Sequence, residues 1–269
     1  MKKFTVCKTL LSIFLFTISF TDAGADGKDS PVQNRQPHVV FLISEDPDNY
    51  EAPRTIPVFA ETLRRDFNFK VTVLLGEGER SAFHFPGLEV ISEADLIVIF
   101  SRRIALRRQQ LDMIKNYLQQ GRPLVGIRTA HHAFSVTGEM SDGHADWPEF
   151  PAEILGCENR GYGPQELGVD VAFAPKARTN SVLRGIEPPQ WHCEGSIYHV
   201  SLLDDKATVL LTGRLKEKLE PVAWTRYTAD NSRVFYTSLG YPSDFEKIQF
   251  NRLLVNGIFW AMAFEVPDN

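Results

Sequence analysis

Four short apolar runs alternate with longer amphipathic segments in the first half of the chain, and this alternation limits the fold more than any other feature. The runs are His38–Ser44, Val71–Leu75, Leu96–Phe100 and Leu124–Ile127. Each is too short for a helix, and such a run bounded by turn residues is typical of a buried parallel strand. The sequence therefore predicts βαβ units in an α/β fold, with a parallel sheet and helices on both faces.

The segments between these runs have helical spacing. Pro57–Phe67 carries an apolar stripe, with Pro57 expected in the first turn. Leu106–Gln120 is a second amphipathic segment, and Gly121 stands where a helix C-cap is expected. In the second half we expect strands at 167–173, 207–212, 221–225 and 233–239, short helical turns at 150–155 and 181–186, and a final helix over 248–264.

The N-terminus has the pattern of an export signal. Three lysines precede the apolar stretch Thr9–Phe20, and Ala23–Ala25 offers a small-residue cleavage site. The apolar stretch is short for a membrane span. We therefore expect residues 1–25 to be a signal peptide, 26–36 a flexible leader and 37–266 one domain, with the protein exported to the periplasm or the exterior and not attached to a membrane.

Charge and cysteine content narrow the classes of partner. The formal net charge of −5 argues against nucleic acid, because phosphate binding requires basic patches. A small-molecule ligand is expected instead, and a homo-oligomer is left open. Cys157 and Cys193 follow the signal segment, and the sequence leaves open whether they form a disulfide or a free buried pair.

The segment Pro123–Phe134 changes abruptly from apolar to polar, and it is the strongest candidate for a site. The strand at Leu124–Ile127 is followed by Arg128, His131 and His132. Residues just past the carboxyl end of a parallel strand face the ligand crevice of an α/β sheet. Because adjacent side chains on a helix diverge, we expect only one histidine to point into a site. The alternative is a helix start whose imidazoles cap the helix or face solvent.

Other strand ends should meet the same edge of the sheet. Right-handed crossovers place the carboxyl ends of parallel strands together, so Glu45, Arg102, Arg128 and His131 are expected to converge. Glu45 and Arg102 are candidate ligand-binding residues. A solvated turn explains Glu45 equally well, and a solvated helix start is the interpretation favoured for Arg103.

Two further regions contain candidate residues. Gln190–His199 contains His192, Glu194 and Tyr198, and Glu194 is the best acid or base among them. Its alternative is a surface carboxylate beside a turn. Trp147 ends a polar loop and is a candidate platform for a sugar ring, although a tryptophan that anchors a loop to the core is commoner.

Several motifs in this order resemble the trehalose-utilisation ThuA-like family. They are Gly126–Phe134, Cys193–Tyr198, Glu220–Thr225, and Arg233–Gly240 continued by Leu253–Ala261. The resemblance runs from about His38 to the C-terminus. It implies a class I glutamine amidotransferase-like, flavodoxin-like sheet with helices on both faces and added strands in the C-terminal half.

The chain departs from the glutamine amidotransferase pattern at the residues that perform its chemistry. Arg128 stands at the position of the elbow cysteine, and Tyr241-Pro242 stands where a His-Pro pair is expected. An arginine cannot replace a thiolate nucleophile, so glutaminase activity is not expected. Cys193 is not at an elbow and does not restore it.

The resemblance implies a role in trehalose or disaccharide metabolism, including 3-keto sugars, for a carbohydrate-active hydrolase, lyase or isomerase. His131 or His132 would be the base, Glu194 the acid, and Arg128 would polarise a carbonyl. The sugar-binding candidates are Glu45, Arg102, Trp147, Tyr198, Trp224 and Tyr241. No cofactor is identified, and a divalent metal held by His131, His192 and Glu194 is left open. The alternative is a non-catalytic sugar-binding or accessory protein.

Overall fold

The computed structural model describes Met1 and residues 35–202 and 206–268. The expected signal peptide, apart from Met1, and nearly all of the expected leader lie outside these residues. The structural unit that contains the sheet begins at Gln36.

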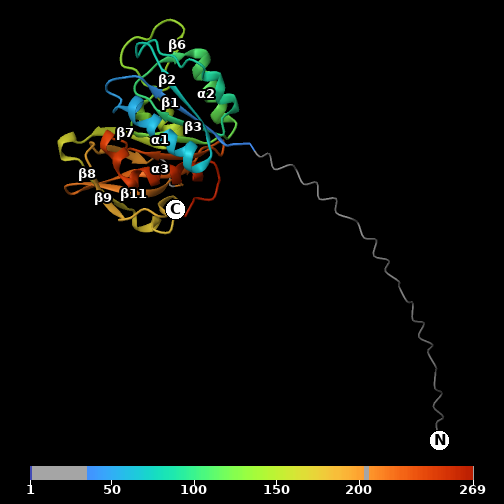
Figure 1. The fold of residues 1–269 in the computed structure, drawn as a ribbon, viewed down its shortest axis with the longest axis vertical. Helices are drawn as coiled ribbons and strands as arrows, with labels where there is room; N and C mark the ends of the chain where they lie inside the picture. The colour runs from blue at the N-terminus through green and yellow to red at the C-terminus, as the bar shows by residue number, and fades with distance from the viewer. Residues whose placement is uncertain (2–34, 203–205, 269) are drawn as a thin grey trace. The chain divides into compact units, whose positions relative to one another are not determined.

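The described residues build one nine-stranded mixed sheet, in the order β2-β1-β3-β5-β13-β12-β11-β8-β9 (Figure 1). The first five strands in this order are parallel, and the last four pair antiparallel. The bounds of the parallel strands are β1 His38–Ser44, β2 Lys70–Gly76, β3 Leu96–Phe100, β5 Leu124–Ile127 and β13 Arg233–Thr237. The antiparallel strands are β12 Lys218–Tyr227, β11 Thr208–Leu215, β8 Val169–Phe173 and β9 Gln190–Cys193. The flavodoxin-like, class I glutamine amidotransferase-like fold expected from the sequence is confirmed.

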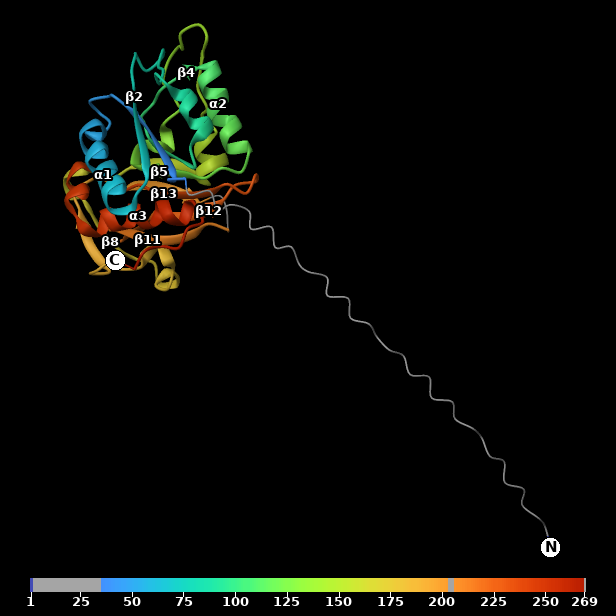
Figure 2. The same ribbon diagram turned by 45° about the vertical axis from the view of Figure 1, so that its right-hand side comes forward.

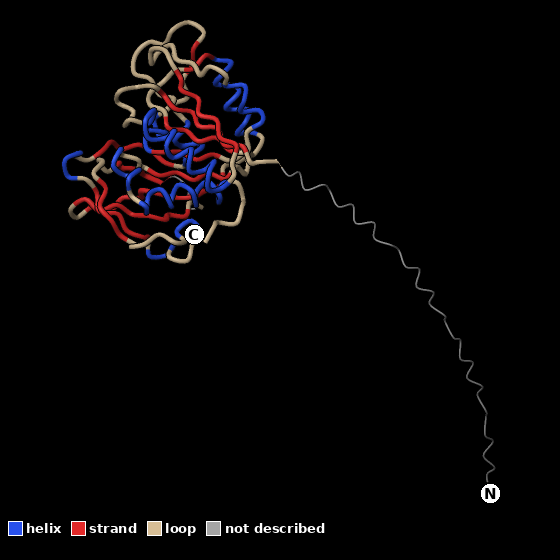
Figure 3. The backbone as a smooth tube through the Cα atoms, viewed as in Figure 1, coloured by secondary structure: helices blue, strands red, loops and turns tan. Residues whose placement is uncertain are grey.

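Two short antiparallel pairs accompany the large sheet. They are β7 Cys157–Tyr162 with β10 Tyr198–Leu202, and β4 Leu106–Arg107 with β6 His144–Ala145. Figure 3 distinguishes the strands of the described residues from the helices and the connecting loops. The pair β7–β10 carries Tyr198 and Asn159, which lie close to the elbow after β5.

The helices α1 Ala52–Phe67 and α3 Ile248–Ala261 cover one face of the sheet, and α2 Arg108–Gln119 covers the other (Figure 2). The residues of β1 show why both faces need cover. Val39, Phe41 and Ile43 join the core beneath α1, whereas Val40 and Leu42 join the core beneath α2. Because successive strand side chains point to opposite faces, a wholly apolar strand must be buried on both sides. Seven short helical turns connect these elements: η1 Leu88–Glu93, η2 Arg128–His132, η3 Pro151–Leu155, η4 Gln165–Leu167, η5 Pro175–Ala177, η6 Ser181–Leu183 and η7 Pro242–Glu246.

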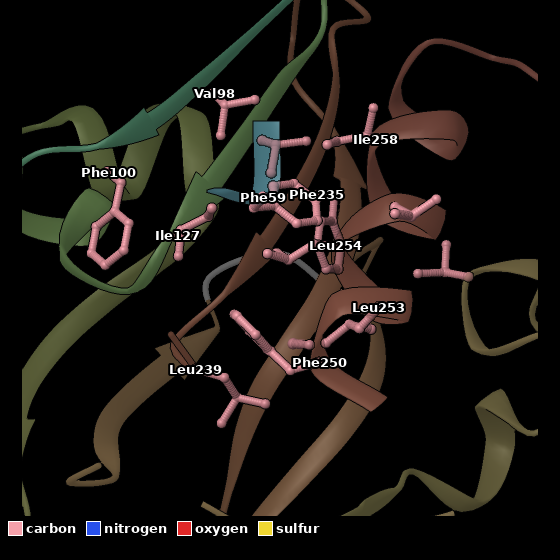
Figure 4. Close-up of a cluster of buried hydrophobic side chains, with 14 of the residues drawn as sticks. Phe59, Val98, Phe100, Ile127, Phe235, Leu239, Phe250, Leu253, Leu254 and Ile258 are labelled. Atoms are coloured by element: carbon pink, nitrogen blue, oxygen red, sulfur yellow. The ribbon is translucent and has the colours of Figure 1, made fainter. Parts of the chain in front are cut away.

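The core beneath α1 and α3 is built of closely packed aliphatic and aromatic side chains (Figure 4). Phe235 of β13 lies against α3, and a Cβ added at Gly257 would stand 2.2 Å from its ring. The absence of a side chain at Gly257 therefore lets the helix approach the sheet at this point. Removing a large buried side chain from such a layer costs about 3–5 kcal/mol for a phenylalanine.

Several boundaries differ from those expected. Helix α1 begins at Ala52, so Pro57 lies inside the helix and not in its first turn. Pro57 lacks the N–H that would donate to the carbonyl four residues earlier, so the helix loses that one hydrogen bond. Pro53, near the first residue of the helix, favours the start of the helix. Helix α2 begins two residues later than expected because Leu106–Arg107 pairs with β6.

The antiparallel region differs more. The segment 213–220 was expected to connect two strands, but β11 and β12 continue through most of it and pair up to Leu215 and Lys218. Strands β7, β9 and β10 were missed. Their sequences are largely polar, and backbone pairing, not an apolar pattern, holds them in place.

Both cysteines after the expected signal segment are buried and free. Across the residues given above, no helix has the length and apolar character needed to cross a membrane.

Candidate active site

The loops that follow the parallel strands lie at one edge of the sheet, and each of three of these loops has a residue with a strained backbone there. Tyr50 follows β1 with φ 51°, Arg103 follows β3 with φ 51°, and Arg128 follows β5 with φ 43°. For side chains larger than glycine this left-handed conformation costs about 1–3 kcal/mol each, and such residues cluster at functional sites. The carboxyl edge is therefore the first place to look for a site.

Arg128 occupies the elbow after β5 and is buried. Its Nη1 donates to the Ser238 carbonyl at 2.9 Å, and its Nη2 lies 3.3 Å from the Ser196 Oγ. Its Cζ lies 4.1 Å from the ring centre of Tyr50 and 4.8 Å from that of Tyr198. Burial lowers the pKa of Arg128, but Tyr198 and Tyr50 raise it and the net shift is upward, so the guanidinium remains a cation held by ring faces and carbonyls.

The glycines of the family-like motifs make room for this arginine. A Cβ at Gly195 would lie 2.9 Å from the Arg128 Nη2, and a Cβ at Gly240 would lie 2.8 Å from Ile127. Gly240 also has φ 117°, which favours glycine. The Tyr236 hydroxyl donates to the Arg128 carbonyl at 2.8 Å. The motifs that are separate in sequence therefore meet around one elbow.

His131 and His132 form a hydrogen-bonded pair. Their Nδ1 atoms are 2.9 Å apart, so one ring donates to the other, and the ring that accepts is neutral. The His131 ring also lies 4.6 Å from that of Tyr198. The expectation that only one ring points into a site is not met, because this bond turns both rings toward the same cavity.

That cavity has a volume of about 320 Å³. It is lined by Arg103, His131, His132, Ser135, Pro148, Pro151, Ala152, Cys157, Glu158 and Asn159. The His131 Nε2 is enclosed and makes no hydrogen bond of normal geometry among the described residues. Asn159, which lines the same cavity, also hydrogen-bonds with the His131 ring. A ring nitrogen at such a wall is a candidate to meet a polar group of a ligand.

Both imidazoles are held neutral by their surroundings. Burial, with the charge of Arg128, lowers the pKa of His131 to about 3, although Asn159 opposes the shift. Burial, His131 and the arginines Arg103, Arg102 and Arg128 lower the pKa of His132 well below its usual value. At neutral pH the pair therefore offers one N–H donor and one lone pair that can exchange roles through the shared bond.

A second, more open pocket of about 440 Å³ lies beside Tyr241. It is lined by Gln165, Glu166, Gly168, His192, Glu194 and Tyr241. Gln165 donates to the Tyr241 hydroxyl at 2.9 Å, and the Tyr241 ring packs 5.9 Å from Tyr50. Carboxylate and amide groups beside an aromatic ring are suited to sugar hydroxyls. Glu194 is exposed in this pocket and does not line the histidine cavity.

The remaining candidates from the sequence are more scattered. Glu45 is exposed on the loop after β1. Arg102 is partly buried, and its Nη1 lies 3.3 Å from an Asp48 carboxylate oxygen. Both residues reach the expected edge of the sheet, but neither lines either of the two cavities described above.

The two tryptophan candidates belong to the interior. Trp147 is 7% exposed and donates from Nε1 to Glu153 at 2.9 Å, so it anchors its loop to the protein. Trp224 is fully buried and donates to the Leu155 carbonyl at 2.8 Å. Neither ring presents a face to a ligand in this structure, so neither is included in the site proposed below.

A metal site from His131, His192 and Glu194 does not assemble here. His192 pairs with Asp170 at 2.8 Å in the open pocket, away from the histidine cavity. Within the described part of the chain, no three His, Cys, Asp or Glu side chains are grouped so as to hold a metal ion.

Neither thiol takes the place of the missing elbow cysteine. Burial raises the pKa of Cys157 to about 12, and burial together with Asp244 raises the pKa of Cys193 further. A nucleophilic cysteine requires a lowered pKa and access to solvent.

Three residues at this edge were not predicted to be site residues from the sequence. Tyr50 ended a loop classed as an acidic turn, Arg103 was assigned to a solvated helix start, and Asn159 lies on a strand that was not recognised. Only the position of the first two after apolar strands could have indicated them. The left-handed backbone conformation of Tyr50 and Arg103 cannot be read from the sequence.

Taken together, the fold and the edge define a class I glutamine amidotransferase-like α/β protein whose elbow carries an arginine in place of a nucleophile. The family described as ThuA, trehalose utilisation, matches residues 39–261, and the chain belongs to this family. Membership associates the protein with carbohydrate metabolism. No curated protein matches the sequence.

Solved structures of two ThuA-like proteins share the fold. The protein from Parabacteroides merdae is 17% identical with a TM-score of 0.62, and the match covers 87% of this chain and 93% of that one. The protein from Bacteroides uniformis is 15% identical with a TM-score of 0.62, covering 84% of this chain and 92% of that one. At this identity the likeness establishes the fold alone.

Proposed function

We propose that the protein performs acid/base chemistry on a sugar, and that His131 and His132 transfer the proton. The observation that supports this proposal is the neutral histidine pair at the wall of the 320 Å³ cavity, with a His131 Nε2 that makes no hydrogen bond of normal geometry among the described residues. Arg103 lines the same cavity and has no ion pair among the described residues, so its charge is available to a developing oxyanion.

The shared Nδ1 hydrogen bond gives the pair a way to move a proton without holding a net charge. When the His131 Nε2 accepts a proton from a ligand, its Nδ1 proton passes to the His132 Nδ1, and His132 releases its own Nε2 proton. Each ring ends neutral, which the burial requires. General acid–base groups of this kind contribute about 10²–10⁴-fold to rate.

The family and the cavity support the proposed substrate class. The family is described as trehalose utilisation, which supports a disaccharide or a sugar derived from it. A 3-keto sugar suits a neutral base, because a carbonyl acidifies the neighbouring C–H bond and stabilises the carbanion as an enolate. Arg103, not the buried Arg128, is the cation placed to receive that oxyanion.

The alternative function, sugar binding without turnover, rests on a different observation. The open pocket beside Tyr241 combines an aromatic ring with Gln165, Glu166 and Glu194. Such a surface can hold a sugar whether or not the histidine pair performs chemistry.

The decisive experiment is turnover of a panel of disaccharides and their 3-keto derivatives, with and without added divalent metal. We expect turnover of at least one keto sugar, lost in His131→Gln. The matched control is His144→Gln, at a partly exposed histidine whose Nδ1 lies 3.1 Å from the Asp142 carbonyl. Binding of sugars by the wild-type protein without any turnover would support the accessory function instead.

Export is part of the same proposal and rests on the N-terminal sequence alone. Cleavage after Ala25 is expected when the protein is secreted. N-terminal sequencing of mature protein tests this, and a mature chain that still begins at Met1 would contradict it.

Glutamine hydrolysis is not expected. Arg128 stands at the elbow, and both remaining thiols are buried with raised pKa values. Ammonia release from glutamine, above a heat-killed control and lost in Cys157→Ser or Cys193→Ser, would overturn this expectation.

A further inference from the structure

Glu220 is a buried carboxylate to which the proposed function gives no role. It begins the family-like motif Glu220–Thr225 on β12, and only 6% of its surface is exposed. Burying a carboxylate is unfavourable unless charged or polar groups replace the water around it. The groups that surround this carboxylate therefore indicate what it holds in place.

Among the described residues, three groups replace that water, and all of them belong to the strand pair β7–β10. Arg160 on β7 donates from Nη2 to both carboxylate oxygens, at 3.1 and 3.3 Å. On β10, the His199 Nδ1 lies 3.0 Å from the Glu220 Oε1, and the Val200 amide donates to Oε2 at 3.3 Å. Because an ionised carboxylate only accepts hydrogen bonds, the His199 Nδ1 carries a proton. Glu220 therefore ties both strands of the pair to the main sheet.

The carboxylate meets the strand pair at an irregular point of its ladder. The register of β7 and β10 shifts between Tyr198 and Val200, so a bulge lies beside Arg160 and His199. The Arg160 Nη2 also donates to the Val200 carbonyl at 2.8 Å and so bridges the two strands there. A bulge redirects side chains, and a slip of the strands past Glu220 would leave its carboxylate buried without donors. The network therefore selects one position for the pair.

A glycine on the neighbouring strand allows the close approach. Gly213 of β11 is the ladder partner of Glu220. A Cβ at Gly213 would lie 3.2 Å from Ile197, the residue that precedes β10. The absence of a side chain at Gly213 thus lets the start of β10 lie against the sheet beside the carboxylate.

The residues next to these anchors reach the histidine cavity. Asn159, which precedes Arg160, lines the cavity and hydrogen-bonds with the His131 ring. Tyr198, which precedes His199, is buried, and its ring centre lies 4.6 Å from that of His131. Any movement of the strand pair would therefore move two groups that contact His131.

We propose that Glu220 is a positioning residue for the proton transfer at His131. By holding the β7–β10 pair against β12, it keeps Tyr198 and Asn159 beside the His131 ring. Glu220 does not line the histidine cavity, so it acts through the strand pair and not on the sugar. The inference rests on the proposed function, since it names the residue that sets the geometry of the same site.

The first test needs no substrate. In protein labelled with ¹³C-histidine, the ring signal of His131 is the one of seven that His131→Gln removes. Glu220→Gln keeps the shape of the side chain but removes its charge, so the signal should shift or broaden as the Tyr198 ring moves. Glu77→Gln is the matched control, because it removes the carboxylate of an exposed pair with His84 at 3.3 Å, and it should leave the signal unchanged. An unchanged His131 signal in folded Glu220→Gln overturns the proposal.

A second variant covers the case in which Glu220→Gln does not fold. Arg160 is half-exposed, and Arg160→Gln leaves the carboxylate its two donors on β10. This variant releases only β7, so a smaller shift of the His131 signal is expected. If Glu220→Gln does not fold, an unchanged signal in Arg160→Gln overturns the proposal.

The kinetic test uses the sugar that the wild type turns over. Per folded molecule, Glu220→Gln should lower kcat by about 10- to 10²-fold, because a misplaced proton-transfer group loses rate, with KM changed only a few-fold. The shape of the pH profile should stay that of the wild type, since Glu220 transfers no proton. An unchanged kcat would remove the role of Glu220 and leave the proposed function intact. A wild type that turns over no sugar would remove the proposed function, whereas the His131 signal would still decide whether Glu220 places the ring.

Discussion

The layer beneath α1 and α3 and the edge around Arg128 are both buried, but they are built in different ways. Beneath the helices, Phe235, Leu254 and Ile258 fill space with apolar groups, and Phe235 packs against a glycine. At the edge, Arg128 and His131 are enclosed, and each keeps a polar atom without a hydrogen bond among the described residues.

The difference separates the region that stabilises the fold from the region to which we assign the proposed chemistry. Burying apolar surface is favourable wherever it occurs, whereas burying an unpaired polar atom costs about 1–3 kcal/mol. Left-handed backbone at Arg128 and Tyr50 adds to this cost. The edge therefore reduces stability in two independent ways beside a cavity, which is consistent with the site proposed there.

The largest effect on stability is expected in the apolar layer. Phe235→Ala should reduce the free energy of unfolding by about 3–5 kcal/mol, because it removes a ring and leaves a cavity against α3. Phe264→Ala is the matched control, since that ring is 42% exposed. Chemical denaturation measures both. Equal losses in the two variants would show that the layer beneath α3 is not the main source of stability.

The second prediction compares how a substitution in each region affects turnover of the sugar. His131→Gln should reduce turnover of the sugar by about 10²-fold or more while the protein remains folded, because glutamine cannot pass a proton to His132. Phe235→Ala should leave turnover per folded molecule nearly unchanged. Initial rates, corrected for the folded fraction, measure both. A rate loss as large in Phe235→Ala as in His131→Gln would break the division between the two regions.

The burial of His131 decides which substitution suits this test. A residue at a pocket rim can be replaced by alanine with little effect on stability, but His131 is fully buried. His131→Ala would leave a cavity, so some loss of stability is expected with it. Glutamine is therefore the better substitution for separating activity from folding.

The third prediction concerns the loss of folding stability at acidic pH. The pKa of His131 falls from 6.5 in the unfolded chain to about 3 in the folded one, so the unfolded state binds more protons between these values. The stability contributed by the neutral ring is present above pH 6.5 and is lost as the pH falls towards 3. Between pH 7 and 5 this loss is about 2 kcal/mol.

The measurement is the unfolding free energy at pH 7 and at pH 5 in the wild type and in His131→Gln. The variant should lose less stability on acidification, although His132 still contributes in the same direction. An identical acid response in His131→Gln and the wild type would contradict a neutral buried ring.

The sequence predicted the parallel half of the fold well because its strands have a clear apolar pattern. His38–Ser44 and Leu96–Phe100 are apolar runs between turns, and both strands have the expected bounds. Their order along the chain, with the handedness of crossovers, then places the residues after β1, β3 and β5 on one edge.

Only some of the site residues could be predicted from the sequence, for a physical reason. Arg128 and His131 were expected at the edge because they directly follow β5. Tyr50, Arg103 and the contact with Asn159 depend on backbone conformation and on a polar strand that tertiary pairing creates. Neither property has a periodic signal, so residue type alone could not distinguish them from solvated turns.

The smallest effect is expected at Glu194, and it tests whether the open pocket belongs with the edge. Glu194 is exposed and lines the pocket beside Tyr241, not the histidine cavity. Glu194→Gln should therefore change the unfolding free energy by less than about 0.5 kcal/mol. It should raise KM a few-fold with kcat nearly unchanged, as for a residue that contributes equally to binding in the ground and transition states.

Glu166→Gln, in the same pocket, should behave alike. Steady-state kinetics of the two variants decide the matter. If Glu194→Gln instead abolishes kcat while Glu166→Gln does not, Glu194 acts as the acid, and the pocket and the histidine cavity form a single centre when the sugar is bound.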